Sequence, residues 1–133
     1  MGREIKFRVW RPHSKSMEIV TRLMWGDVVT FGKITQISSE VTDLQPDLVT
    51  LMQFTGLFDK NGTEIYEGDR LSAIIPSYIN VGAAGKLKEV EVRWENEQGG
   101  FLAEWEYSKN QHYVNLTCDV AHCSEVIGNI YEK

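Results

Sequence analysis

The alternation of apolar and polar residues along several short segments is the feature that most constrains the fold. Residues 89–94 read EVEVRW, which places Val90, Val92 and Trp94 on one face of an extended strand. No window of the sequence carries a sustained apolar stripe at the 3.6-residue period of a helix. The pattern therefore predicts a mainly β protein, or an α+β protein with one or two short helices.

Two turn signals lie close together in residues 54–71, FTGLFDKNGTEIYEGDRL. Asp59 can accept backbone hydrogen bonds and Gly62 can take a positive φ, so DKNG predicts a type I turn followed by a left-handed glycine. The sequence EGD at 67–69 predicts a second tight bend. Because small β-barrels need such corners, the segment favours a barrel with additional β-hairpins. The structural turn residues of this prediction are Asp59, Asn61, Gly62, Gly68 and Asp69.

The remaining segments are assigned by the same criteria. Residues 5–20 predict a strand, a six-residue turn region and a return strand, whereas the polar residues 34–47 predict a loop with short strands. Residues 48–57 suit a buried strand; a helical turn at 46–51 is the alternative, because Pro46 fits a first helical turn. Loop 76–88 is rich in small residues. Further strands are expected at 70–75, 101–105, 114–118 and 124–131.

Length and composition indicate one soluble globular domain. A chain of 133 residues with 42% hydrophobic residues can build a core of its own. The prediction is a single domain over 1–133, with a smaller lobe at 1–50 and the barrel at 51–133 as a subdivision. No apolar run approaches the ~18 residues of a membrane span, and the start does not read as a signal peptide, so the cytoplasm is expected.

The net charge of −5 is distributed unevenly. Residues 1–33 hold seven Lys/Arg and three Asp/Glu, and residues 34–133 hold seven and sixteen. A basic end can bind nucleic acid by releasing counterions. Because the whole chain is acidic, packing against the acidic remainder or against a neighbouring subunit is the favoured interpretation. The residues of the nucleic-acid alternative are Arg3, Lys6, Arg8, Arg11 and Lys15.

Two groups of residues suggest catalytic or metal chemistry, and each has a simpler interpretation. His112, Cys118, His122 and Cys123 are ligand types for zinc, but their spacing is poor and adjacent strand residues face opposite ways. Buried cysteines and surface histidines are favoured instead. The carboxylates of residues 59–69 can perform acid–base or Mg²⁺ chemistry, yet turns collect Asp and Glu, so a solvated turn is favoured. No Walker loop, GxGxxG or GxSxG motif is present, and no cofactor is expected.

Aromatic residues offer a third kind of site. They can form a stacking platform or a protein interface, although most are more simply explained as core. Trp105 and Tyr107 share one strand face, so an exposed face there would be an interaction patch. The interaction residues expected from charge and aromatic content are Arg3, Lys6, Arg8, Trp10, Arg11, Trp105 and Tyr107.

Three blocks of sequence resemble the YopX family. They are REIKFRVW at 3–10, MQFTGLFDKNGTEIYEGD at 52–69 and EVIGNIYE at 125–132, and they frame the chain. Residues 11–51 and 72–124 contain no matching motif. The resemblance implies a bacteriophage or prophage protein of the bacterial cytoplasm, with a bent, SH3-like β-barrel. It supplies no catalytic residues.

The sequence therefore favours a non-catalytic β-barrel interaction or assembly module. Its expected partner is a phage or host protein, or a second copy of the chain, and no membrane. Self-association is plausible because open strand edges must be covered. Nucleic-acid binding through the basic N-terminal hairpin is one alternative, and a metal-assisted enzyme is the other.

Overall fold

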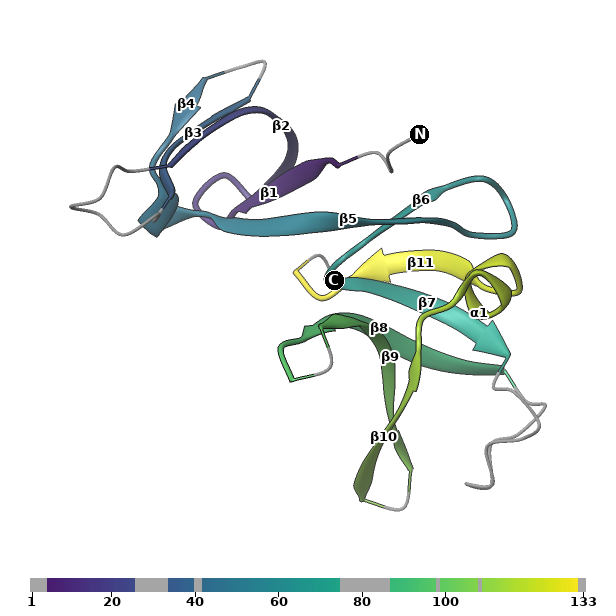
Figure 1. The fold of residues 1–133 in the computed structure, drawn as a ribbon. Helices are drawn as coiled ribbons and strands as arrows, with labels where there is room; N and C mark the ends of the chain where they lie inside the picture. The colour runs from purple at the N-terminus through teal and green to yellow at the C-terminus, as the bar shows by residue number, and fades with distance from the viewer. Residues whose placement is uncertain are drawn as a thin grey trace. The chain divides into compact units, whose positions relative to one another are not determined.

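The computed structural model describes residues 5–25, 34–39, 42–74, 87–97, 99–107 and 109–131 (Figure 1). Within these residues the chain is mainly β, as the alternation predicts, with one 3-10 turn and one short α-helix. In chain order the elements are β1 (Phe7–Arg11), β2 (Ser16–Trp25), β3 (Ile34–Ser39), β4 (Asp43–Leu44), η1 (Pro46–Leu48), β5 (Thr50–Phe58), β6 (Glu64–Tyr66), β7 (Asp69–Ile74), β8 (Leu87–Glu95), β9 (Gly100–Tyr107), β10 (Asn110–Asn115), α1 (Cys118–His122) and β11 (Glu125–Asn129).

The strands form two antiparallel sheets, in the orders β4-β3-β2-β1-β5-β6 and β10-β9-β8-β7-β11. The chain divides into two compact units, here called the N-terminal unit (Glu4–Gln53) and the C-terminal unit (Phe54–Lys133). Strand β5 crosses this boundary, since its first part pairs with β1 and its second part with β6. The described strands do not close into a barrel, so the SH3-like barrel stays a prediction.

The N-terminal unit is a bent sheet around a small core. Strands β1 and β2 form the hairpin expected at residues 5–20, with Trp10 opposite Met17. Strand β2 is ten residues long and curves strongly (Figure 1), and its register against β3 shifts at Thr21, where an extra residue increases the bend. The buried core is Val9, Ile37 and Leu44, with Val20, Leu23, Ile34, Val49 and Leu51 packed against it.

The C-terminal unit is built on the β7–β8–β9 meander. Val92 of the alternating segment pairs with Ala103 of β9, and Leu71 of β7 pairs with Val90. The alternation therefore directs one apolar face of the sheet into the core. The buried core consists of Ile65, Leu71, Ala73, Val90, Val92, Ala103, Trp105, Val114, Leu116, Val120 and Ala121.

The segment after β10 differs from the sequence prediction. A strand over 114–118 is wrong beyond Asn115, because α1 begins at Cys118. The Thr117 side chain caps this helix by accepting a hydrogen bond from the Val120 N–H, and Val120 and Ala121 are buried. No helix in the described ranges is long and apolar enough to cross a membrane.

The segment 34–47, predicted as a loop with short strands, contains β3, β4 and the start of η1. Strand β3 pairs with β2 along most of its length, which satisfies its backbone. Residues 48–57 divide between the two alternatives, with η1 starting at Pro46 and β5 starting at Thr50. Of loop 76–88, residues 76–86 lie outside the described residues, and 87–88 begin β8.

Candidate interaction surface

The N-terminal unit carries an open hollow of about 580 Å³. Pro12 and His13 of the β1–β2 turn form one wall, and Leu48, Val49 and Thr50 form the other. Val49 also packs against the small core, so the hollow adjoins it. Leu48 is 68% exposed, the highest value among the exposed large apolar side chains of the described residues. We call this site the N-terminal hollow; burying Leu48 against another molecule would be favourable.

Sheet pairing brings the two walls together. Trp10 of β1 lies opposite Thr50 of β5, so the turn that follows β1 is adjacent to the segment that precedes β5. Pro12 belongs to the first wall, and Pro46 begins η1 just before the second wall; a proline ring restricts the backbone at both places. The turn ends at Lys15 with φ of 54°. The hollow is therefore held by strand pairing and by restricted turns.

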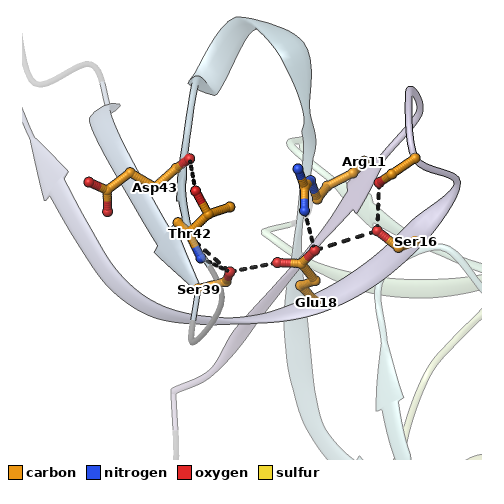
Figure 2. Close-up of polar contacts among 7 residues, drawn as sticks. Arg11, Ser16, Glu18, Ser39, Thr42 and Asp43 are labelled. Atoms are coloured by element: carbon orange, nitrogen blue, oxygen red, sulfur yellow. Dashed lines mark hydrogen bonds and ion pairs between the residues drawn. The ribbon is translucent and has the colours of Figure 1, made fainter.

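A polar network centred on Glu18 joins three strands of the same unit (Figure 2). The carboxylate accepts hydrogen bonds from Ser39 Oγ at 2.5 Å, from Arg11 Nη1 at 2.6 Å and from Ser16 Oγ at 3.5 Å. Thr42 continues the network, because its backbone N–H donates to Ser39 Oγ at 3.3 Å. These bonds, led by that from Ser39, hold the pKa of Glu18 below its ordinary value of 4.5. Alternation could not reveal this network, since Glu18 and Ser39 are 21 residues apart.

Asp59 has a structural role at the β5–β6 turn. Its Oδ1 accepts the backbone N–H groups of Asn61 and Thr63 at 2.8 and 2.9 Å, and its Oδ2 accepts that of Val126 at 2.9 Å. Burial alone would raise the pKa of Asp59, but these three donors and the Lys60 charge lower it overall. Gly62 has φ of +82°, the conformation that DKNG favours. The carboxylate thereby fixes the turn to β11.

The second bend is also a structural junction. Asp69 is 2% exposed and accepts the Tyr66 N–H at 2.8 Å. Gly68 has φ of +87°, donates its N–H to Val92 at 2.8 Å and accepts from Ile130 at 2.9 Å. The interpretation of these carboxylates as a solvated turn is therefore wrong for Asp59 and Asp69, which are buried and bind backbone N–H groups.

The cysteines and histidines considered for zinc do not assemble a described site. Cys118 and Cys123 are exposed free thiols, which corrects the expectation of buried cysteines. His122 ends α1 instead of lying in a strand, while the ring of His112 in β10 lies 5.9 Å from that of Trp105. Within the part of the chain that the structure describes, no three His, Cys, Asp or Glu side chains are placed to hold a metal ion.

The aromatic residues selected from the sequence are not surface residues where their side chains are described. Trp10 is 8% exposed and Trp105 is 4% exposed, so neither presents an interaction patch. The side chain of Tyr107 lies outside the described residues.

Trp94 is an exposed tryptophan among the described side chains, and it was not one of the predicted interaction residues. It is 39% exposed, and its ring packs edge-on against Phe101 at 5.1 Å between centroids. Its Nε1 donates to Asn96 Oδ1 at 2.7 Å. Trp94 and Trp105 occupy the same alternating face of the β8–β9 hairpin, but Trp94 lies near the turn and Trp105 lies in the core. Alternation predicts that the two tryptophans share a face, but it does not predict which of them is buried.

The predicted basic residues that the structure describes differ in burial and pairing. Arg3 lies outside the described residues, Lys6 and Arg8 are half-buried, and Arg11 is bound to Glu18. Lys15 is exposed. The N-terminal unit contains six Lys/Arg and six Asp/Glu, because acidic residues after position 33 offset the basic start. The N-terminal unit as a whole therefore has equal numbers of basic and acidic residues, unlike residues 1–33 alone.

The fold and these surfaces define a two-sheet antiparallel β protein with an open apolar hollow. The family model described as YopX protein matches residues 6–133. The chain belongs to the YopX family, as the three sequence blocks indicate.

The chain is also similar to a solved structure, described as the crystal structure of protein EF1440 from Enterococcus faecalis. The TM-score is 0.60 at 25% sequence identity, and the match covers 98% of this chain and 95% of that chain. No curated protein matches the chain. The family and the structural likeness support the fold and bring no assigned activity with them.

Proposed function

We propose that the chain is a non-catalytic β module that binds another protein through the N-terminal hollow. The observation that carries this proposal is Leu48, which is 68% exposed beside an open hollow of about 580 Å³. Burying a leucine fully contributes about 1.5 to 3 kcal/mol, enough for one anchor of an interface. The partner presents an apolar side chain that enters the hollow and covers Leu48.

The lining of the hollow supports binding over catalysis. Of its five lining residues, His13 is the one with an imidazole, carboxylate, amine or thiol side chain. A nucleophilic or acid–base site pairs at least two such groups in defined geometry. The hollow therefore offers shape and apolar area. The equal numbers of basic and acidic residues in the N-terminal unit favour a protein partner over nucleic acid.

The family resemblance supplies the context of this proposal. It favours a phage or host protein in the bacterial cytoplasm as the partner, with a second copy of the chain as the alternative. A phage or prophage origin and cytoplasmic location belong to the same proposal.

A photo-crosslinking amino acid placed at Leu48 tests the surface directly in bacterial cells. The matched control is the same amino acid at Ile127, an aliphatic residue of β11 that is 51% exposed. We expect a discrete protein adduct from position 48 that is absent from position 127. Mass spectrometry then identifies a different protein or a second copy of the chain.

Equal labelling from both positions, or a nucleic-acid adduct without a protein one, would contradict the proposal. Once the partner is known, Leu48→Ser should weaken its affinity by about tenfold, corresponding to the loss of one buried anchor. Ile127→Ser should leave the affinity unchanged.

A further inference from the structure

The β5–β6 turn contains a reactive dipeptide that the binding surface does not use. The sequence has six asparagines, and Asn61 is the one followed by glycine. An asparagine side-chain amide can be attacked by the backbone nitrogen of the next residue. Glycine offers this nitrogen with the least steric hindrance, because it has no Cβ. Asn61 is also exposed, so water reaches its side chain.

The structure restrains the attacking nitrogen. The Gly62 N–H donates to the Asp59 carbonyl oxygen at 3.1 Å, while the Asn61 N–H donates to Asp59 Oδ1 at 2.8 Å. Attack requires the Gly62 nitrogen to lose its proton and turn toward the Asn61 side chain, so the turn must open first. We propose that Asn61 is a deamidation site gated by the Asp59 turn, protected while the turn is closed and reactive when it opens.

The reaction needs no partner other than water. The Gly62 nitrogen loses its proton and bonds to the Asn61 side-chain carbonyl carbon, and the bond from that carbon to the amide nitrogen breaks. Ammonia leaves, and a five-membered succinimide remains. Water then opens either carbonyl of the ring, giving aspartate or isoaspartate at position 61. The net change consumes one water and releases one ammonia.

The product fits the turn less well than asparagine does. The Asn61 Nδ2 donates to Glu125 Oε1 at 3.5 Å, so a carboxylate at this position meets a like charge. Isoaspartate also lengthens the main chain by a methylene where the N–H groups of residues 61 and 63 converge on Asp59. Modification therefore favours the open turn and weakens its attachment to Val126. The modification therefore accumulates in one direction, because deamidation does not reverse.

The test compares the full protein with a synthetic peptide of residues 58–66 in the same mildly alkaline buffer. Peptide mapping by mass spectrometry measures modification at Asn61, with Asn115, which precedes leucine, as the internal control within the protein. We expect Asn61 to react at least about tenfold more slowly in the folded protein than in the peptide, since only open molecules react. Asn115 should remain unmodified over the same period.

The variant Asp59→Asn should move the Asn61 rate toward the peptide rate without changing Asn115. Near-ultraviolet circular dichroism establishes whether this variant is folded. If it is not, amide hydrogen exchange at Gly62 of the wild type gives the open fraction, which should account for the ratio of the two Asn61 rates. Equal Asn61 rates in protein and peptide, or a ratio unrelated to the open fraction, would overturn the gate.

Discussion

The C-terminal and N-terminal units are both antiparallel β structures, but they bury very different amounts of apolar material. Among the described residues, the C-terminal core cluster contains eleven buried hydrophobic residues, whereas the N-terminal core cluster contains three. The two units also differ in the burial and the partners of their central carboxylates. Asp59 is buried and binds backbone N–H groups, while Glu18 is partly exposed and binds mainly side chains.

The larger core lies in the C-terminal unit, whereas the candidate contact surface lies in the N-terminal unit. Two of the three family-like blocks lie mostly in the C-terminal unit, where Asp59, Gly68 and Val126 join the β5–β6 turn, β8 and the C-terminal segment. The N-terminal unit leaves a hollow beside its small core. Leu48 lies beside this small core and is 68% exposed, and in the proposed function it is the side chain that a partner covers.

The largest expected effect tests the difference between the cores. Leu71→Ala in the C-terminal unit should lower the free energy of unfolding by about 3 kcal/mol, because the lost contacts leave a cavity in a large, closely packed cluster. Ile37→Ala in the N-terminal unit should cost less, about 2 kcal/mol, since half-buried neighbours can relax into the space. Urea unfolding of both variants measures the costs. A larger loss for Ile37→Ala would reverse the comparison of the two cores.

An intermediate effect is expected at Asp59. Asp59→Asn keeps the shape of the side chain but presents an amide to the Val126 N–H, and should cost about 2 kcal/mol at neutral pH. Because the folded-state pKa of Asp59 is lowered, its contribution is complete above the ordinary value of 3.8 and is lost as the pH falls through the folded pKa. The stabilities of wild type and variant should therefore converge in acid. A difference that stays constant below that value would show that the charge is not what stabilises the turn.

Local patterns predicted much of the C-terminal unit and less of the N-terminal unit. The alternation at 89–94 and the DKNG turn are local signals, and they identify β8 and the β5–β6 reversal. Strand β3 reads ITQISS, which has no such alternation, and it is a strand because it pairs with β2, the strand that precedes it in the chain. The α1 helix has only five residues, so helix propensity alone does not predict it. The Thr117 cap and two buried residues stabilise it.

The candidate site was harder to predict than the fold. Leu48 and His13 are brought together by the pairing of β1 with β5, which the sequence does not specify. The burial of Trp105 and the exposure of Trp94 depend on where the core ends along one hairpin. The signal that could have found the hollow is Pro46 followed closely by Leu48, since a proline-started turn is short and its last residue has few neighbours to cover it.

The smallest expected effect lies in the Glu18 network. Glu18→Gln keeps a carbonyl oxygen for Ser39 but weakens the contact with Arg11, and should cost at most about 1 kcal/mol because the pair is partly exposed. The folded-state pKa of Glu18 is lowered, so its contribution to stability is complete above 4.5 and is lost as the pH falls through the folded-state pKa.

For Glu18→Gln, amide hydrogen exchange should quicken in β1, β2 and β3 and stay unchanged in β7, β8 and β9. Arg22→Gln, at an exposed position of β2, is the matched control and should leave exchange unaltered. Equal quickening in both units would mean that Glu18 acts on the whole molecule, and the comparison of two separately stabilised units would then have to be abandoned.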